Sequence, residues 1–211
     1  MLGLPTIIKK INQKECKKKL GLSDKKILVI LGYIRSSKNY GIVLDALKIL
    51  DKNTFLLFVG GVQQEKDEIE RENIIKKTKD LGLDKRVKLL GFVSDKELPI
   101  ILGSADLGIN LHVQGGGDFM SSTMAMQLAY ETPMLATRIP SFEHLEKKEK
   151  CIETFEEGDI KGLAKKIKDI LNNNSKTKAL KEGTKRYWKK SNWDEVGRKA
   201  KKLYLNLIKL K

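Results

Sequence analysis

The chain has 211 residues, 40% hydrophobic and 33% charged, which suits one globular domain with a heavily solvated surface. Lysine and arginine number 42 against 27 acidic residues, so the +15 surface should attract phosphorylated small molecules, nucleic acid or an anionic membrane. The two cysteines are isolated, which argues against a disulfide scaffold. The two histidines are far apart in the sequence, so no metal site is predicted. No apolar run approaches the ~18–20 residues that cross a bilayer. A cytoplasmic protein is therefore expected.

Apolar runs alternate with helical patterns through the first two thirds of the chain. Short β-branched runs predict strands at 25–32, 54–61, 86–92, 106–113 and 133–137. Helical spacing predicts helices at 42–50, 64–80, 95–105 and 120–131. This alternation indicates an α/β fold: a Rossmann-like parallel sheet with helices on both faces.

Beyond residue 150 the pattern becomes mostly helical. One helix is predicted at 158–171, ended by an Asn-rich segment, and another begins at Trp193. We expect a single domain over 1–211, with 174–211 as a C-terminal helical extension. The last helix is amphipathic and basic. The simplest interpretation is that Trp193, Leu203 and Leu207 pack on the sheet; the alternative is a membrane-surface element.

The loop GYIRSSKN (32–39) directly follows the first predicted strand. Gly32 permits a tight turn, and Arg35 and Lys38 supply two cations that suit phosphate oxygens. The N-terminus of the following helix adds partial positive charge. These features favour a phosphate site; a strand–turn–helix corner with solvated charges is the alternative.

A second loop, VQGGGDFMSST (113–123), follows the fourth predicted strand. Three consecutive glycines indicate close approach of backbone to a ligand, and Ser121, Ser122 and Thr123 then open a helix. The alternative is a flexible loop with ordinary Ser/Thr capping. The chain has neither GxxxxGK[ST] after its first strand nor GxGxxG, so it is neither a P-loop protein nor a dinucleotide-binding domain of the usual type.

A third loop, GFVSDKE (91–97), follows the third predicted strand. Gly91, Phe92 and Val93 offer an apolar wall and free backbone groups to a flat base. By itself this segment is more simply explained as the end of a strand.

In this order the loops, together with ADLGINLH, AYETPMLAT and a tail beginning SNWDEV, resemble a known family. They are similar to the C-terminal, donor-binding domain of family 4 retaining glycosyltransferases of the GT-B type, the glycosyl transferases group 1. The resemblance covers about residue 4 to residue 210. It implies one half of a GT-B fold with additional C-terminal helices.

The resemblance also implies roles for the loop residues. Arg35 and Lys38 fall where the family neutralises the diphosphate, after the family's glycine, Gly32. Gly91, Phe92 and Val93 match the segment that meets the base, and the amides of Ser121, Ser122 and Thr123 match the turn at the distal phosphate. The family's two glutamates are replaced: Asp118 can still accept hydrogen bonds from sugar hydroxyls, but Met126 cannot bind a ribose.

The implied function is donor binding for a retaining hexosyltransferase. The domain would hold a UDP- or GDP-sugar and stabilise the departing diphosphate, without a metal or other cofactor. The acceptor domain is missing and would lie in the same or a partner chain, so this domain alone would be inactive. The alternative is a basic module that binds nucleic acid or a membrane surface without catalysis. With only 6% aromatic residues and no recognised motif, nucleic acid is not the expected partner.

Overall fold

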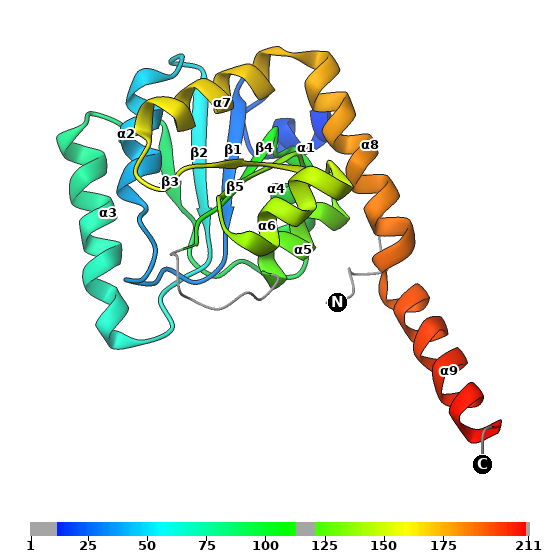
Figure 1. The fold of residues 1–211 in the computed structure, drawn as a ribbon. Helices are drawn as coiled ribbons and strands as arrows, with labels where there is room; N and C mark the ends of the chain where they lie inside the picture. The colour runs from blue at the N-terminus through cyan, green and yellow to red at the C-terminus, as the bar shows by residue number, and fades with distance from the viewer. Residues whose placement is uncertain (1–11, 113–120, 210–211) are drawn as a thin grey trace.

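The computed structural model describes residues 12–112 and 121–209. Within them, six parallel strands form one sheet in the order β3-β2-β1-β4-β5-β6 (Figure 1). The strands are β1 Lys26–Leu31, β2 Thr54–Val59, β3 Val87–Leu89, β4 Leu107–Asn110, β5 Met134–Thr137 and β6 Ile152–Phe155. The reversal of strand order beside β1 is typical of a doubly wound α/β fold.

Helices connect the strands and extend the chain beyond them. Before β6 they are α1 Gln13–Lys19, α2 Gly41–Ile49, α3 Glu68–Asp80, α4 Leu98–Ser104, α5 Ser122–Ala129 and α6 Pro140–His144. A 3-10 turn, η1 Glu65–Asp67, precedes α3, and a π-helical turn, η2 Leu145–Glu149, continues α6. After β6 come α7 Ile160–Asn172, α8 Asn174–Ser191 and α9 Trp193–Lys209.

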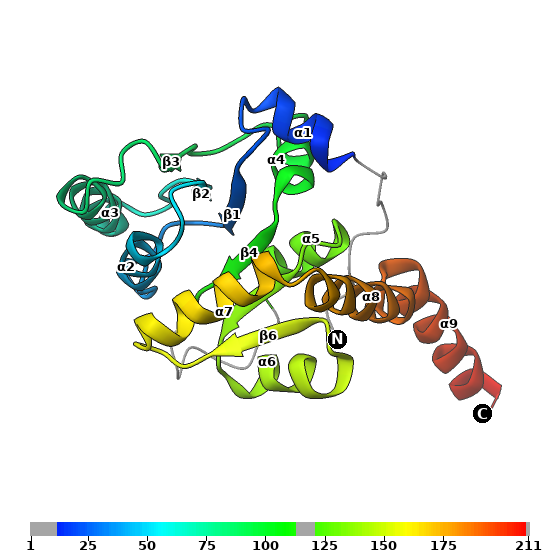
Figure 2. The ribbon, with the colours of Figure 1, turned by 90° about the horizontal axis from the view of Figure 1, so that it is seen from above.

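The centre of the sheet is buried on both faces because alternate residues of β1 and β2 enter different hydrophobic clusters. On one face Leu28 and Ile30 of β1 pack with side chains of α2, α3 and α7. On the other face Ile27 and Val29 pack with side chains of α4. Figure 2 shows α2, α3 and α7 on one side of the sheet and α1, α4 and α5 on the other. This layering confirms the predicted fold class and the five predicted strands.

The strand β6 was not predicted, and the expectation of a mostly helical chain beyond residue 150 is wrong at this point. Its sequence is only IETF, at the edge of the sheet, and its alternation is too short to stand out. The charged Glu153 within this segment interrupts the apolar pattern that would predict a strand. In the structure Glu153 pairs with Lys176 of α8 at 2.6 Å, which keeps its carboxylate compensated at a largely covered position.

The last two helices differ in how they meet the domain. Leu180 and Tyr187 of α8 are buried in the hydrophobic clusters of the sheet. Asn192 then adopts an extended conformation and accepts a hydrogen bond from the Glu195 amide at 3.0 Å, which starts α9 in a new direction. Figures 1 and 2 show α9 leading away from the sheet.

The interpretation that the apolar side chains of α9 pack on the sheet is wrong. Trp193 is 51% exposed, Leu203 59% and Leu207 53%. The physical reason is the bend at Asn192, which carries α9 past the end of the sheet. No helix in the described parts of the chain is both long enough and apolar enough to span a bilayer.

Candidate functional site

The candidate site lies where β1 and β4 end. These strands are parallel neighbours, so their carboxyl ends reach the same edge of the sheet. A Cβ atom built on Gly32, after β1, would lie 2.9 Å from Cγ2 of Thr123 in the first turn of α5. The structure therefore brings Gly32, the first residue of the loop 32–39, against the helix start that carries Ser121, Ser122 and Thr123. Farther along the same loop, Arg35 contacts Gln63, which follows β2.

Two glycines make this close approach of strand ends possible. Gly32 has φ +121° and Gly60 has φ +128°, conformations that L side chains rarely adopt. A Cβ atom on Gly60 would lie 2.3 Å from the carbonyl oxygen of Gly32. The Gly60 amide also donates to the Gly91 carbonyl at 2.8 Å, so the ends of β1, β2 and β3 are held in direct backbone contact.

The buried side chains of Tyr40 and Asp67 hold the loop after β1 in place through hydrogen bonds. The buried Tyr40 hydroxyl donates to the Tyr33 carbonyl at 3.1 Å and accepts from the Arg35 amide at 3.2 Å. The buried carboxylate of Asp67 accepts from the Ser36 amide at 2.8 Å and the Ser36 hydroxyl at 3.1 Å. Burial raises the pKa of Tyr40 to about 12, and the hydrogen bond from the Ser36 amide lowers the pKa of Asp67. Both groups keep these hydrogen-bonding forms at neutral pH.

Arg35 and Lys38 lie close enough together for their charges to interact, and the charge of Arg35 also helps to lower the pKa of Asp67. Among the described residues neither cation lies within ion-pair distance of an Asp or Glu side chain. Arg35 is exposed; its Nη2 donates to Gln63 at 3.2 Å, and its Cζ lies 5.8 Å from the centre of the Tyr33 ring. Burial of the Lys38 ammonium, and secondarily the charge of Arg35, lower the pKa of Lys38. An anion bound beside them would relieve this repulsion.

The start of α5 supplies hydroxyls and backbone amides. Asn110, the buried last residue of β4, donates from Nδ2 to the Ser121 hydroxyl at 3.1 Å and the Thr123 hydroxyl at 3.4 Å. These two hydroxyls lie 2.8 Å apart, so one of them donates to the other. Ser121 also caps the helix by accepting from the Met124 amide. The amides of Ser122 and Thr123 have no intrahelical acceptor, which suits an anion.

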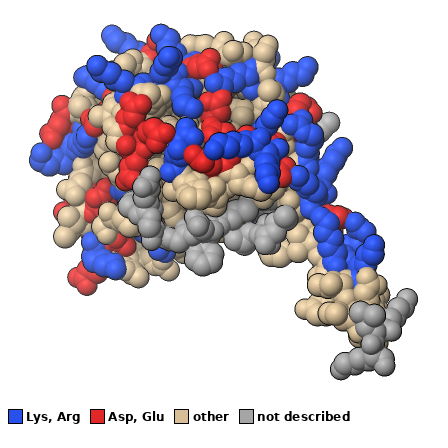
Figure 3. Space-filling view, in the orientation of Figure 1, with Lys and Arg blue, Asp and Glu red and all other residues tan. Residues whose placement is uncertain are grey.

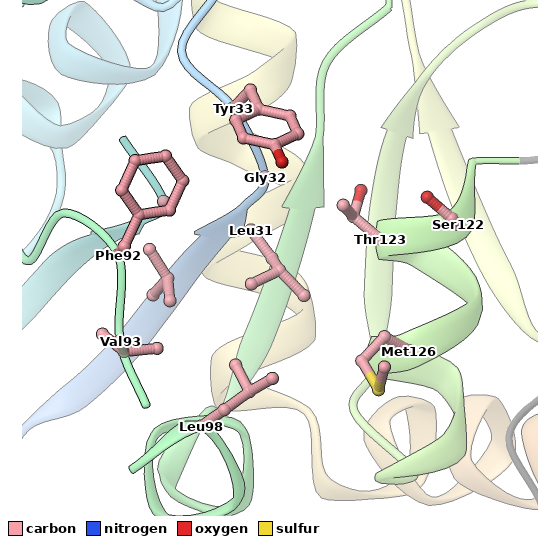
Figure 4. Close-up of a pocket in the computed structure, with 11 residues that line it drawn as sticks. Leu31, Gly32, Tyr33, Phe92, Val93, Leu98, Ser122, Thr123 and Met126 are labelled. Carbon is pink, nitrogen blue, oxygen red and sulfur yellow. The ribbon is translucent and has the colours of Figure 1, made fainter. Parts of the chain in front are cut away.

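A cavity of about 340 Å³ opens beside these groups (Figure 4). It is lined by Leu31, Gly32, Tyr33, Val59, Gly60, Phe92, Val93, Leu98, Ser122, Thr123 and Met126. The rings of Tyr33 and Phe92 meet edge to face, with centroids 5.8 Å apart, and both rings are exposed. Figure 4 shows the pocket bounded on one side by Val93 and Leu98, and on the other by Thr123 and Met126 of α5.

The predicted site residues take distinct places around this cavity. Gly32, Phe92, Val93, Ser122 and Thr123 line it. Ser121 is the N-cap residue of α5. Gly91 has φ +64° and turns the chain after β3. Arg35 and Lys38 belong to the adjoining loop, while Asp118 and the glycine run fall outside the described residues.

Sequence reasoning missed several members of the site. Leu31, Val59 and Leu98 look like ordinary core residues in a strand or helix, and nothing in the sequence separates them from the rest of the core. Asn110 did carry a signal, because a buried strand that ends on a polar residue is one whose last side chain meets the loops. Among the described residues no three His, Cys, Asp or Glu side chains gather to hold a metal ion.

A doubly wound parallel sheet whose carboxyl edge carries a largely apolar cavity, a loop with two cations and a helix N-terminus is a Rossmann-like domain of the kind that binds ligands at this edge. Comparison with known families makes the class specific. Residues 12–187 match the family described as glycosyl transferases group 1, and the chain belongs to this family.

Individual relatives are more distant. The chain is 32% identical over 87 residues to mannosylfructose-phosphate synthase of Agrobacterium fabrum, a match that covers 39% of this chain and 19% of that protein. The structure of HepE of Anabaena in complex with UDP superposes with a TM-score of 0.81 at 16% identity, over 92% of this chain and 52% of HepE. The C-terminal domain of the group 1 glycosyl transferase LpcC of Francisella tularensis superposes with a TM-score of 0.73 at 16% identity, over 91% of this chain and 97% of that domain.

These similarities establish the GT-B Rossmann-like fold. The chain spans about half the length of HepE, and its 87-residue match covers about a fifth of mannosylfructose-phosphate synthase.

Proposed function

We propose that this chain binds the donor of a retaining hexosyl transfer, a UDP- or GDP-sugar, with its diphosphate between the loop after β1 and the start of α5. The observation that carries the proposal is the contact between Gly32 and Thr123. It brings the first residue of the loop that carries Arg35 and Lys38 against a helix N-terminus whose first amides lack intrahelical acceptors. Oxygens of a diphosphate have the charge and the acceptors to satisfy both groups.

The same groups would act in the reaction. Breaking the bond between the sugar and the diphosphate leaves negative charge on the departing diphosphate. Arg35, Lys38 and the amides at Ser121–Thr123 would stabilise that charge as it develops, and they would do so without a metal ion. Asp118 would accept hydrogen bonds from hydroxyls of the transferred sugar.

Relatives support a nucleotide-sugar as the ligand. HepE has been solved with UDP and also with UDP-glucose. We propose that the acceptor is held by a second domain, in the same or a partner chain, as the partial coverage of HepE suggests. The present 211 residues would then bind the donor and transfer little or no sugar by themselves.

Isothermal titration calorimetry with UDP, GDP and their glucose or mannose derivatives tests the proposal. We expect saturable one-to-one binding of at least one nucleoside diphosphate. Uridine and guanosine serve as controls and should bind far more weakly, because they lack the group that the two cations and the amides satisfy. Equal affinity for nucleoside and nucleoside diphosphate, or no binding of any nucleotide, contradicts the proposal.

A second proposal is peripheral contact with an anionic membrane surface in the cytoplasm, and α9 favours it. Leu203, Tyr204, Leu207 and Ile208 are exposed and fall on one helical face. Figure 3 shows lysine and arginine gathered over α8 and the first turns of α9, beyond which uncharged residues predominate. Basic amphipathic helices bind the interface of anionic membranes.

Flotation with phosphatidylserine-containing vesicles tests this contact. The chain should float with anionic vesicles and not with neutral ones. The triple variant Leu203→Glu, Leu207→Glu, Ile208→Glu should remain at the bottom of the gradient, since it loses apolar contact and gains three negative charges. Identical flotation of the two proteins would exclude α9 as the contact.

A further inference from the structure

We infer that Asp67 is a positioning residue of the proposed diphosphate site, and that it acts by holding the turn whose two ends are Arg35 and Lys38. The inference rests on the proposed function, since it concerns the same two cations. It adds a residue from the segment between β2 and α3 to those that decide how tightly the diphosphate binds.

The two cations lie at the ends of a tight turn. The Lys38 amide donates to the Arg35 carbonyl at 3.1 Å, which is the bond between residues i and i+3 that closes a β-turn. Ser36 and Ser37 are the central residues of this turn, and neither has a positive φ. Burial of the Lys38 ammonium, and after it the nearby charge of Arg35, lower the pKa of Lys38. The turn therefore keeps two like charges near each other, and other contacts must hold it.

Asp67 makes hydrogen bonds that hold the first central residue of this turn. Its Oδ1 accepts from the Ser36 amide at 2.8 Å and from the Ser36 hydroxyl at 3.1 Å, although the two residues are 31 positions apart in the chain. Asp67 directly precedes α3, where an aspartate commonly caps the helix, yet its side chain makes no capping hydrogen bond there. The carboxylate is buried and serves the turn rather than its own helix.

The carboxylate holds the turn without pairing with its cations. In the described part of the chain, no ion pair joins Asp67 to Arg35 or Lys38. The hydrogen bond from the Ser36 amide is the main cause of the lowered pKa of Asp67, and the charge of Arg35 contributes less. The Arg35 guanidinium donates to Gln63 at 3.2 Å instead. Asp67 thus fixes the backbone that carries the cations and leaves both side chains able to meet an anion.

Asp67→Ala should weaken the binding of UDP or GDP by about tenfold, because the two cations would then be held together only part of the time and the apparent affinity falls with that fraction. Asp67→Asn keeps a carbonyl oxygen that can accept from Ser36 and should bind within about threefold of the wild-type chain. Glu146→Ala is the matched control. Glu146 accepts from the amide and from the hydroxyl of Thr154, each at 2.7 Å, in β6 at the far edge of the sheet. Its removal should leave nucleotide affinity unchanged.

The double variant Ser36→Pro, Asp67→Ala tests whether Asp67 acts through the turn. Proline has no amide to donate, but it favours the second position of a β-turn and so replaces the two hydrogen bonds by a conformational restraint. The double variant should recover an affinity within about threefold of the wild-type chain. A carboxylate that contacted the ligand itself could not be replaced in this way.

Titration calorimetry with UDP and GDP, together with urea unfolding of each variant, separates the outcomes. If the wild-type chain binds neither nucleotide, the proposed function fails and the inference fails with it. If the wild-type chain binds and Asp67→Ala binds equally well, the proposed function stands and Asp67 has no positioning role. If Asp67→Ala does not fold, Asp67→Asn and the double variant decide. Affinities like that of the wild-type chain in these two variants support the inference, and a tenfold loss in the folded double variant overturns it.

Discussion

Lys38→Ala should weaken the binding of UDP or GDP by about 1–3 kcal/mol, roughly 5- to 150-fold. The reason is that Lys38 is half-buried, lacks a carboxylate partner among the described residues and has a lowered pKa, so a bound diphosphate would be its principal counter-ion. Arg35→Ala should give a loss near the lower end of this range, because the exposed guanidinium is better screened by solvent. Titration calorimetry measures both losses.

The pH dependence provides a separate measurement of the same charge. The bound anion favours the ammonium form, so affinity should fall as the pH rises through the pKa of Lys38, which lies below the usual lysine value. Lys38→Arg keeps a permanent charge and should lose this dependence.

Lys168→Ala, on an exposed part of α7, removes one charge elsewhere and should change affinity little. Unchanged affinity in both Lys38→Ala and Arg35→Ala would show that the diphosphate lies elsewhere.

Gly60→Ala should reduce the free energy of unfolding by about 2–4 kcal/mol and should also disrupt nucleotide binding. The new Cβ atom would lie 2.3 Å from the Gly32 carbonyl oxygen, at a φ of +128° that alanine rarely adopts. Relief of this clash requires the ends of β1 and β2 to separate, which displaces the loop carrying Arg35 and Lys38. Urea unfolding and calorimetry with UDP measure the two effects.

Gly82→Ala is the matched control. Gly82 has φ +66°, but a Cβ atom there would meet nothing within 4 Å, so only the conformational penalty of about 1 kcal/mol remains. Its nucleotide affinity should be unchanged. If the two variants lose the same stability, the contact between Gly60 and Gly32 contributes nothing beyond backbone conformation.

Most of the fold could be predicted because its strands are continuous apolar runs separated by helical patterns. Strands buried on both faces, such as Lys26–Leu31 and Thr54–Val59, leave this signature without tertiary information. The strand Ile152–Phe155 has four residues with glutamate among them, and its pairing with β5 makes it a strand. Tertiary contacts of this kind do not show in local sequence.

The sequence indicates the loop residues of the candidate site but not the hydrophobic core residues that line its cavity. Glycines, cations and hydroxyls that follow strands stand out in the sequence, and they indicate the segments around Gly32 and Thr123 as candidates. The cavity wall is built from Leu31, Val59 and Leu98, whose chemistry is the same whether they face another side chain or a ligand. The exposure of α9 was unpredictable for a related reason: an amphipathic pattern shows which face is apolar but not what covers it.

The anchoring of Arg35 and Ser36 by Tyr40 and Asp67 also bears on how quickly a ligand is captured. Because Tyr40 and Asp67 make these hydrogen bonds without any ligand, the loop that carries Arg35 and Lys38 is held in its conformation before an anion binds. Capture of the proposed diphosphate would then require little ordering of the chain, and its rate would be set by diffusional encounter and long-range attraction to a positively charged surface. Association should accordingly slow as ionic strength rises, with dissociation changing much less.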